Sequence, residues 1–125
     1  TPWERLERFV AGFARMVGAD KDFLRLMQWV LLDTDEARQR TLAEQVFGEM
    51  FDAIHCLVGT LDPHRDAHLL VVSILGLVIF HFQTGAIRKF MPGHRPKHED
   101  NPEVLPRHVC DLLRRGLAEA DEAAR

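Results

Sequence analysis

The chain has no tyrosine and only two cysteines among its 125 residues, Cys56 and Cys110. Neither cysteine has a partner at the spacing of zinc ligands, and two isolated thiols are too few for a disulfide framework. This usage is typical of reduced thiols in a cytoplasmic protein. Because both cysteines lie among apolar residues without an obvious base, we expect neither thiol to be reactive.

An excess of charge of one sign is also lacking. The 16 basic and 19 acidic residues give a formal net charge of −3 and are mixed along the sequence. Because there is no basic stripe, we expect no direct binding of nucleic acid by these residues. The sequence has no Gly-rich phosphate loop and no activated-nucleophile motif. Glu49 is followed three residues later by Asp52, not by the histidine of a carboxylate-bridged di-iron bundle. We predict that the chain is not an enzyme and holds no cofactor or metal.

One long apolar run is present. Between Leu69 and Phe82, only Ser73, Gly76 and His81 interrupt the apolar residues. A membrane-spanning helix needs about 20 apolar residues, so we interpret this shorter run as a buried helix of a protein without membrane contact. A helix that is apolar on every side must also be covered on every side. We expect its own subunit to cover one face and a second copy of the chain to cover another.

Helical periodicity and capping signals predict an all-α fold with five helices in a single domain, residues 1–125. Thr1, Asp20 and Asn101 are plausible helix caps, and Gly48 permits a kink in the third helix. Pro106 is tolerable only in the first turn of the last helix. The expected helices cover residues 2–17, 21–32, 35–61, 66–90 and 102–118, with a loop at 91–100 and a frayed tail at 118–125.

Three segments carry a resemblance to a known family: DKDFLRLMQWVLLDTDEARQRTLAEQVFGEMFDAI (20–54), the apolar helix (68–90), and NPEVLPRHVCDLLRRGL (101–117). In the order and lengths of its helices, the chain resembles the C-terminal ligand-binding and dimerisation domain of TetR-family transcriptional regulators. The resemblance implies an inducer pocket among the earlier helices. It also implies a homodimer in which the last two long helices of each subunit form a four-helix interface. The family reads DNA with an N-terminal helix-turn-helix module. These residues contain no such module, so DNA binding is expected only of a parent protein.

We therefore predict the regulatory domain of a TetR-like repressor that binds a small hydrophobic or aromatic effector. Phe and Met residues at helical spacing are first of all expected in the core, and a pocket is the second interpretation. The pocket candidates are Phe13, Met16, Leu24, Met27, Phe47, Met50, Phe51, His55, Phe80 and His81. The dimer-interface candidates are Val72, Leu75, Gly76, Ile79, Val109, Leu112, Leu113 and Gly116.

The two histidines among the pocket candidates have two interpretations each. His55 is either the polar end of a pocket or a flank residue that covers the edge of the core. His81 either orients a ligand or crosses the dimer axis, or it is a core or interface histidine bonded to a backbone carbonyl or a side chain. A buried imidazole needs a hydrogen-bond partner, and the core or interface interpretation is favoured.

Two alternative functions stay open. A plain helical dimerisation module would have a filled core around Phe47, Met50 and Phe51 and no small-molecule site. A small metal- or haem-binding bundle is the less favoured alternative. His64 and His68 have the i, i+4 spacing of two ligands on one helical face, but no third ligand completes the set.

Overall fold

The computed structural model describes the backbone of residues 1–124 and the side chains of residues 1–117. The described part is helical and contains no strand, which confirms the all-α prediction. No helix within it combines the length and hydropathy required to cross a membrane. The tail expected to fray, residues 118–125, lies outside the described side chains. The elements are α1 Pro2–Ala19, α2 Lys21–Leu32, α3 Glu36–Thr41, the π-helix η1 Leu42–Phe47, α4 Gly48–Leu61, α5 Ala67–Gln83, α6 Gly85–Arg88, α7 Lys97–Asp100 and α8 Val104–Ala124.

Short polar side chains begin α1, α2 and α5. Thr1 caps α1, Asp20 caps α2 and Asp66 caps α5, each by accepting a hydrogen bond from the backbone N–H three residues ahead, at 3.0 to 3.2 Å. These N–H groups have no partner within their own helix, so the side-chain oxygen satisfies a donor that would otherwise need water. The caps expected at Thr1 and Asp20 are therefore confirmed.

The predicted helix at 35–61 is continuous, but it is not uniform. Its middle turn is η1, a π-helical segment that ends at Phe47, directly before Gly48, where the sequence permits a kink. Such segments widen the helix locally. Asp35 caps the helix by accepting from the backbone N–H of Arg38 at 2.9 Å, while Asp33 forms an ion pair with the Arg38 side chain at 2.6 Å.

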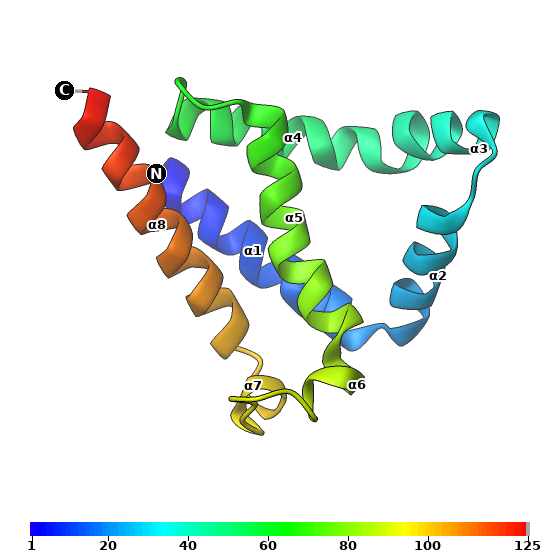
Figure 1. Ribbon diagram of the computed structural model, residues 1–125. Coiled ribbons are helices and arrows are strands. Elements are labelled where there is room, and N and C mark those ends of the chain that lie inside the picture. The colour runs from blue at the N-terminus through cyan, green and yellow to red at the C-terminus, as the bar shows by residue number, and fades with distance from the viewer. Residues whose placement is uncertain (125) are drawn as a thin grey trace.

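The core lies among α1, α4, α5 and α8, with α1 packed against the other three (Figure 1). The C-terminal ends of α1 and α5 lie close together at Gly18 and Phe82. A Cβ added at Gly18 would lie 2.9 Å from the Phe82 ring, so the absence of a side chain at Gly18 permits this approach. The fully buried side chains are Leu6, Val10, Val17, Val58, Val71, Ile74, Val78 and Val109.

The segment formed by α2, α3 and η1, which we call the arm, touches this core through Phe23 and Leu24 at the start of α2 and otherwise extends away from it. None of its residues is fully buried. In Figure 1 the arm leaves the end of α1 and returns to α4 at a distance from α5. The structure differs from the expected bundle of five helices in this respect, because among the described residues the buried apolar side chains come from four helices, α1, α4, α5 and α8.

The region expected to join the last two helices also differs from the prediction. The apolar helix ends at Gln83 and is followed by the short α6, and the expected loop contains α7. Pro106 is the third residue of α8, in the first turn, where its missing N–H would have no helical partner anyway. Asn101 accepts from the backbone N–H of Glu103 at 3.0 Å and so stabilises the turn that precedes α8.

One buried carboxylate fixes the corner between α4 and α5. Asp62 accepts from the backbone N–H of His64 at 3.1 Å and from Nε of Arg65 at 3.0 Å. Arg65 also donates to the carbonyl oxygen of Gly116 at 3.1 Å. The ion pair therefore connects this corner to α8.

Candidate functional site

The ten pocket candidates are distributed over the core and its surface. Phe13 is buried in the core, and Met50 and Phe51 are half-buried against it. Met16 and Phe80 are exposed. Leu24 and Met27 on α2 and Phe47 at the end of η1 are half-buried. Five surface hollows of about 270 to 740 Å³ are formed by described residues, and their linings include only one of the ten candidates, His81.

His55 lies on the surface at the edge of the core. Its ring faces that of Phe51 with the centroids 6.4 Å apart, and His68 approaches the same Phe51 ring at 5.2 Å. Both histidines therefore flank a half-buried aromatic side chain. This geometry agrees with the interpretation of His55 as a flank residue.

The interface candidates on α8 divide into two groups. Val109 is fully buried and Leu113 nearly so, because α8 presses them against the other core helices. Their own chain covers these two side chains, so they expose little surface to a second copy. Leu112 is about half exposed, while Gly116 is half-buried and its carbonyl accepts from Arg65.

On α5, the interface candidates lie on both sides of the helix. Leu75 and Ile79 are half-buried against the core, whereas Val72 and Gly76 point away from it. Leu69, Val72 and Phe80 expose 62, 49 and 66% of their surface, although all three are large and apolar. The exposed residues Leu69, Val72, Ser73, Gly76 and Phe80 form a continuous row at helical spacing, which we call the outer α5 face.

A second feature lies where the far end of α5 meets α6, α7 and the start of α8. A hollow of about 270 Å³ is lined there by one residue of α5, one of α6, one of α7 and three of α8. We call it the histidine hollow. Its lining residues are His81, Arg88, His98, Val104, Leu105 and His108.

Arg88 organises the polar wall of this hollow. Its guanidinium donates to the His81 carbonyl oxygen at 2.8 Å and to Thr84 Oγ1 at 3.2 Å, and it pairs with Glu99 Oε1 at 2.9 Å. His94 Nε2 lies 2.7 Å from the other oxygen of Glu99. Through these bonds Arg88 ties α6 to α5 and α7.

These contacts shift the pKa values of two groups. Burial lowers the pKa of the His81 imidazole below 6.5, and the positive charge of Arg88 lowers it further. Burial alone would raise the pKa of Glu99, but the hydrogen bond with His94 and the charge of Arg88 bring it below its usual value. At neutral pH the site therefore holds a neutral His81 beside a paired Glu99.

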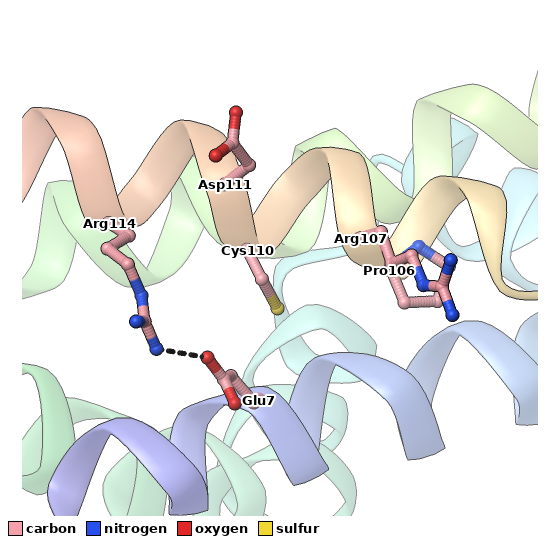
Figure 2. A pocket seen from close by; sticks show the side chains of 6 residues that line it. All are labelled: Glu7, Pro106, Arg107, Cys110, Asp111 and Arg114. Atoms are coloured by element: carbon pink, nitrogen blue, oxygen red, sulfur yellow. Dashed lines mark hydrogen bonds and ion pairs between the residues drawn. The ribbon is translucent and has the colours of Figure 1, made fainter.

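The hollow between α1 and α8 contains a cysteine and an ion pair (Figure 2). Arg114 donates to Glu7 at 2.6 Å, and the Cys110 thiol points toward α1 beside this pair. Burial raises the pKa of the Cys110 thiol, and the nearby carboxylate of Glu7 raises it further. Such a thiol is mostly protonated at neutral pH, which makes it a weak nucleophile.

The largest of the five hollows lies on the arm, between α2 and α3. Its volume is about 740 Å³, and it is lined by Trp29, Val30, Leu32 and Leu42 together with the Asp33–Arg38 ion pair. The sequence interpretation did not select Trp29 or Leu32, because both fall outside the apolar stripe of α2. Their position was itself a signal, because large apolar residues on the polar side of an amphipathic helix often mark a surface that binds something.

The described residues contain no group of three or more His, Cys, Asp or Glu side chains placed to hold a metal ion. The comparisons with known proteins add no assignment to these geometries: no family model, no curated protein and no solved structure matches the chain.

Proposed function

We propose that this chain is the dimerisation and effector-binding half of a TetR-like transcriptional repressor, and that two copies associate through the outer α5 face. The observation that carries the proposal is the row of uncovered apolar side chains on this face. Single exposed apolar residues are ordinary, but contiguous apolar patches mark interaction surfaces. Ser73 and Gly76, in the middle of the row, would let two helices approach closely.

A homodimer is the simplest way to cover a single helical face, because twofold symmetry pairs the face with itself. The resemblance to TetR-family regulators, which lies in the order and lengths of the helices, points to the same helix. In this proposal DNA would be read by a helix-turn-helix module outside these residues. An effector that binds one arrangement of the two subunits more tightly than another would change the spacing of the DNA-reading modules.

The experiment is sedimentation velocity on the wild-type chain and two matched variants. Val72→Arg places a charge on the outer α5 face, and Leu32→Arg places the same charge on the arm, where the side chain is 82% exposed. We expect the wild type and Leu32→Arg to sediment at twice the chain mass of 14.4 kDa. We expect Val72→Arg to weaken association at least about 30-fold, the effect of losing about 2 kcal/mol at the centre of an interface.

Because Val72 is half exposed in the single chain, its replacement should leave the helical circular dichroism unchanged. A Val72→Arg chain that stays dimeric, or a wild-type chain that is monomeric at high concentration, would contradict the proposal.

A second candidate function is a plain dimerisation module without a small-molecule site. One observation favours it: Met50 and Phe51 pack against the core, and none of the five hollows includes them or Phe47. The two candidates differ in their response to a screen of small compounds by thermal melting. An effector-binding domain is stabilised by its ligand, whereas a plain module is not.

A further inference from the structure

The histidine hollow brings together polar side chains that are far apart in the sequence. His81, Arg88, His98 and His108 come from α5, α6, α7 and α8, and they converge on one hollow with an apolar floor. A concave site with a few convergent polar groups on an apolar surface is the usual form of a small-molecule site.

We propose that this hollow binds a small organic carboxylate. The charged end of the ligand would meet Arg88 and the surrounding imidazoles, and its apolar body would lie on Val104 and Leu105. The inference rests on the proposed effector-binding role and gives that role a ligand class. It also moves the site from the Phe and Met residues selected from the sequence to the other end of α5.

The donors for a carboxylate are available on Arg88. A guanidinium has five N–H groups. Among the described residues, Thr84, the His81 carbonyl and Glu99 engage three of them. Two N–H groups therefore remain, and a planar guanidinium is suited to holding a carboxylate through two parallel hydrogen bonds.

The charge of the lining favours an anion over a cation. Arg88 carries the formal charge, and the lining within the described residues includes no carboxylate. Glu99 is close by, but its two oxygens are directed to Arg88 and His94. Val104 and Leu105 would leave an inorganic anion without contacts on one side. A volume of about 270 Å³ limits the ligand to a small molecule.

Benzoate is a suitable probe, because it combines a carboxylate with a small apolar ring. Its binding can be followed by the histidine ring resonances in nuclear magnetic resonance. Benzyl alcohol has the ring without the charge, and inorganic phosphate has the charge without the ring. We expect benzoate to bind with a Kd on the order of 1 mM and to shift the ring resonances of His81, His98 and His108. We expect the two other probes to bind at least about tenfold more weakly. Equal binding of phosphate, or no ring shifts with benzoate, would overturn the inference.

Four variants test the geometry. Arg88→Gln and His108→Gln should each weaken benzoate binding, Arg88→Gln by about tenfold or more, the loss expected for a charged hydrogen bond. Lys89→Met removes a neighbouring positive charge that does not line the hollow, and it should leave the affinity unchanged. Glu99→Gln removes the internal carboxylate that competes for Arg88, and it should strengthen benzoate binding.

A purely structural role of these residues would not produce opposite effects for Arg88→Gln and Glu99→Gln. Arg88→Gln also removes the bonds that hold α6 to α5 and α7, and it could weaken binding for that reason alone. His108 forms no hydrogen bond to another described side chain, so His108→Gln tests the hollow without this structural effect. Equal weakening by Lys89→Met and His108→Gln would overturn the inference.

The same titration on Val72→Arg separates this inference from the proposed dimer. Benzoate binding to a monomeric Val72→Arg chain, with a dimeric wild type, would support both proposals. Benzoate binding to a wild-type chain that is monomeric at high concentration would overturn the dimer and support the site. A dimeric wild type in which benzoate shifts no histidine ring resonance would overturn the proposed site and leave the proposed dimer unaffected.

Discussion

The core helix α1 and the arm helix α2 have similarly amphipathic sequences, but the core and the arm have different surroundings. In the core, Leu6, Val58 and Ile74 are fully buried. In the arm, Trp29 and Leu32 expose 79 and 82% of their surface, and the corner between α2 and α3 is held by the exposed Asp33–Arg38 ion pair. An apolar stripe therefore fixes which side of a helix is suited to burial, whereas burial itself depends on a second helix being within reach.

The largest effect should come from shortening an apolar side chain in each region. Ile74→Ala leaves a cavity between α5 and the other core helices, and we expect a loss of about 2 to 5 kcal/mol in the free energy of unfolding. Leu32→Ala removes a side chain that touches little, and we expect a change within about 0.5 kcal/mol. Urea denaturation of both variants measures the difference. Equal losses would mean that the arm is packed as tightly as the core in solution.

The buried ion pair of Asp62 should rank second. Asp62→Ala leaves Nε of Arg65 and the backbone N–H of His64 without their acceptor, which should cost about 1 to 3 kcal/mol. Asp111→Ala is the matched control. It removes an exposed partner of Arg115 on α8, and we expect at most about 0.5 kcal/mol. A similar loss in both variants would show that burial does not set the value of the Asp62 contact.

A pH titration should separate the two regions again, with smaller effects. The pKa of His81 is lower in the folded chain than the ordinary 6.5, because burial and Arg88 disfavour its charged form. The unfolded chain therefore binds more protons below about pH 6.5, and stability should fall as the pH drops through this range. Unfolding in urea at about pH 7.5 and about pH 5.5 measures this loss, and His81→Gln should reduce it. An unchanged dependence in this variant would contradict the assignment.

The arm should respond only to stronger acid. The hydrogen bonds from Arg38 and from the backbone of Asp35 lower the pKa of Asp33 from 3.8 to about 2. Its contribution is complete above pH 3.8 and is lost as the pH falls toward about 2. The two tryptophans report on separate regions, since Trp29 is on the arm and Trp3 on α1. In acid, the indole N–H resonance of Trp29 should respond to the loss of the ion pair. A response of Trp3 alone would contradict this expectation.

The smallest effect should come from Gly76→Ala, and its sign depends on the state of the chain. A Cβ at Gly76 meets no atom within 4 Å in the single chain, so alanine should stabilise α5 by about 1 kcal/mol. Gly12→Ala on α1 is the control, because it also meets nothing within 4 Å. If two α5 helices pack closely at Gly76, its substitution should weaken the dimer while Gly12→Ala does not. Identical effects of both variants on association would argue against close packing there.

The features predicted correctly from the sequence are mostly local ones. Thr1 and Asp20 act on backbone groups three residues ahead, so neighbouring residues are enough to recognise them. The position of the arm depends on which helices reach one another in space, and α2 carries a stripe as regular as that of α1. For the same reason, the sequence did not separate Val109, which its own chain covers, from Leu112, which remains half exposed.

Of the residues that line the histidine hollow, the sequence selected only His81 as a candidate. His81 was noticeable because it interrupts an apolar run. Its companions Arg88, His98 and His108 lie on three later elements and share no spacing that would connect them. The sequence also favoured the Phe and Met residues for a pocket, since apolar residues that fill a core and those that line a cavity have the same periodicity.

Disulfide trapping between two copies tests the dimer proposal most directly. Gly76→Cys and Leu32→Cys would each be introduced into a chain in which Cys56 and Cys110 are replaced by Ser and Ala. A disulfide requires the two Cα atoms to lie within about 7 Å, so only residues near a twofold axis can form one. The account predicts crosslinked dimers from Gly76→Cys under mild oxidation and almost none from Leu32→Cys. Efficient crosslinking through Leu32→Cys with none through Gly76→Cys would place the interface on the arm and contradict the account.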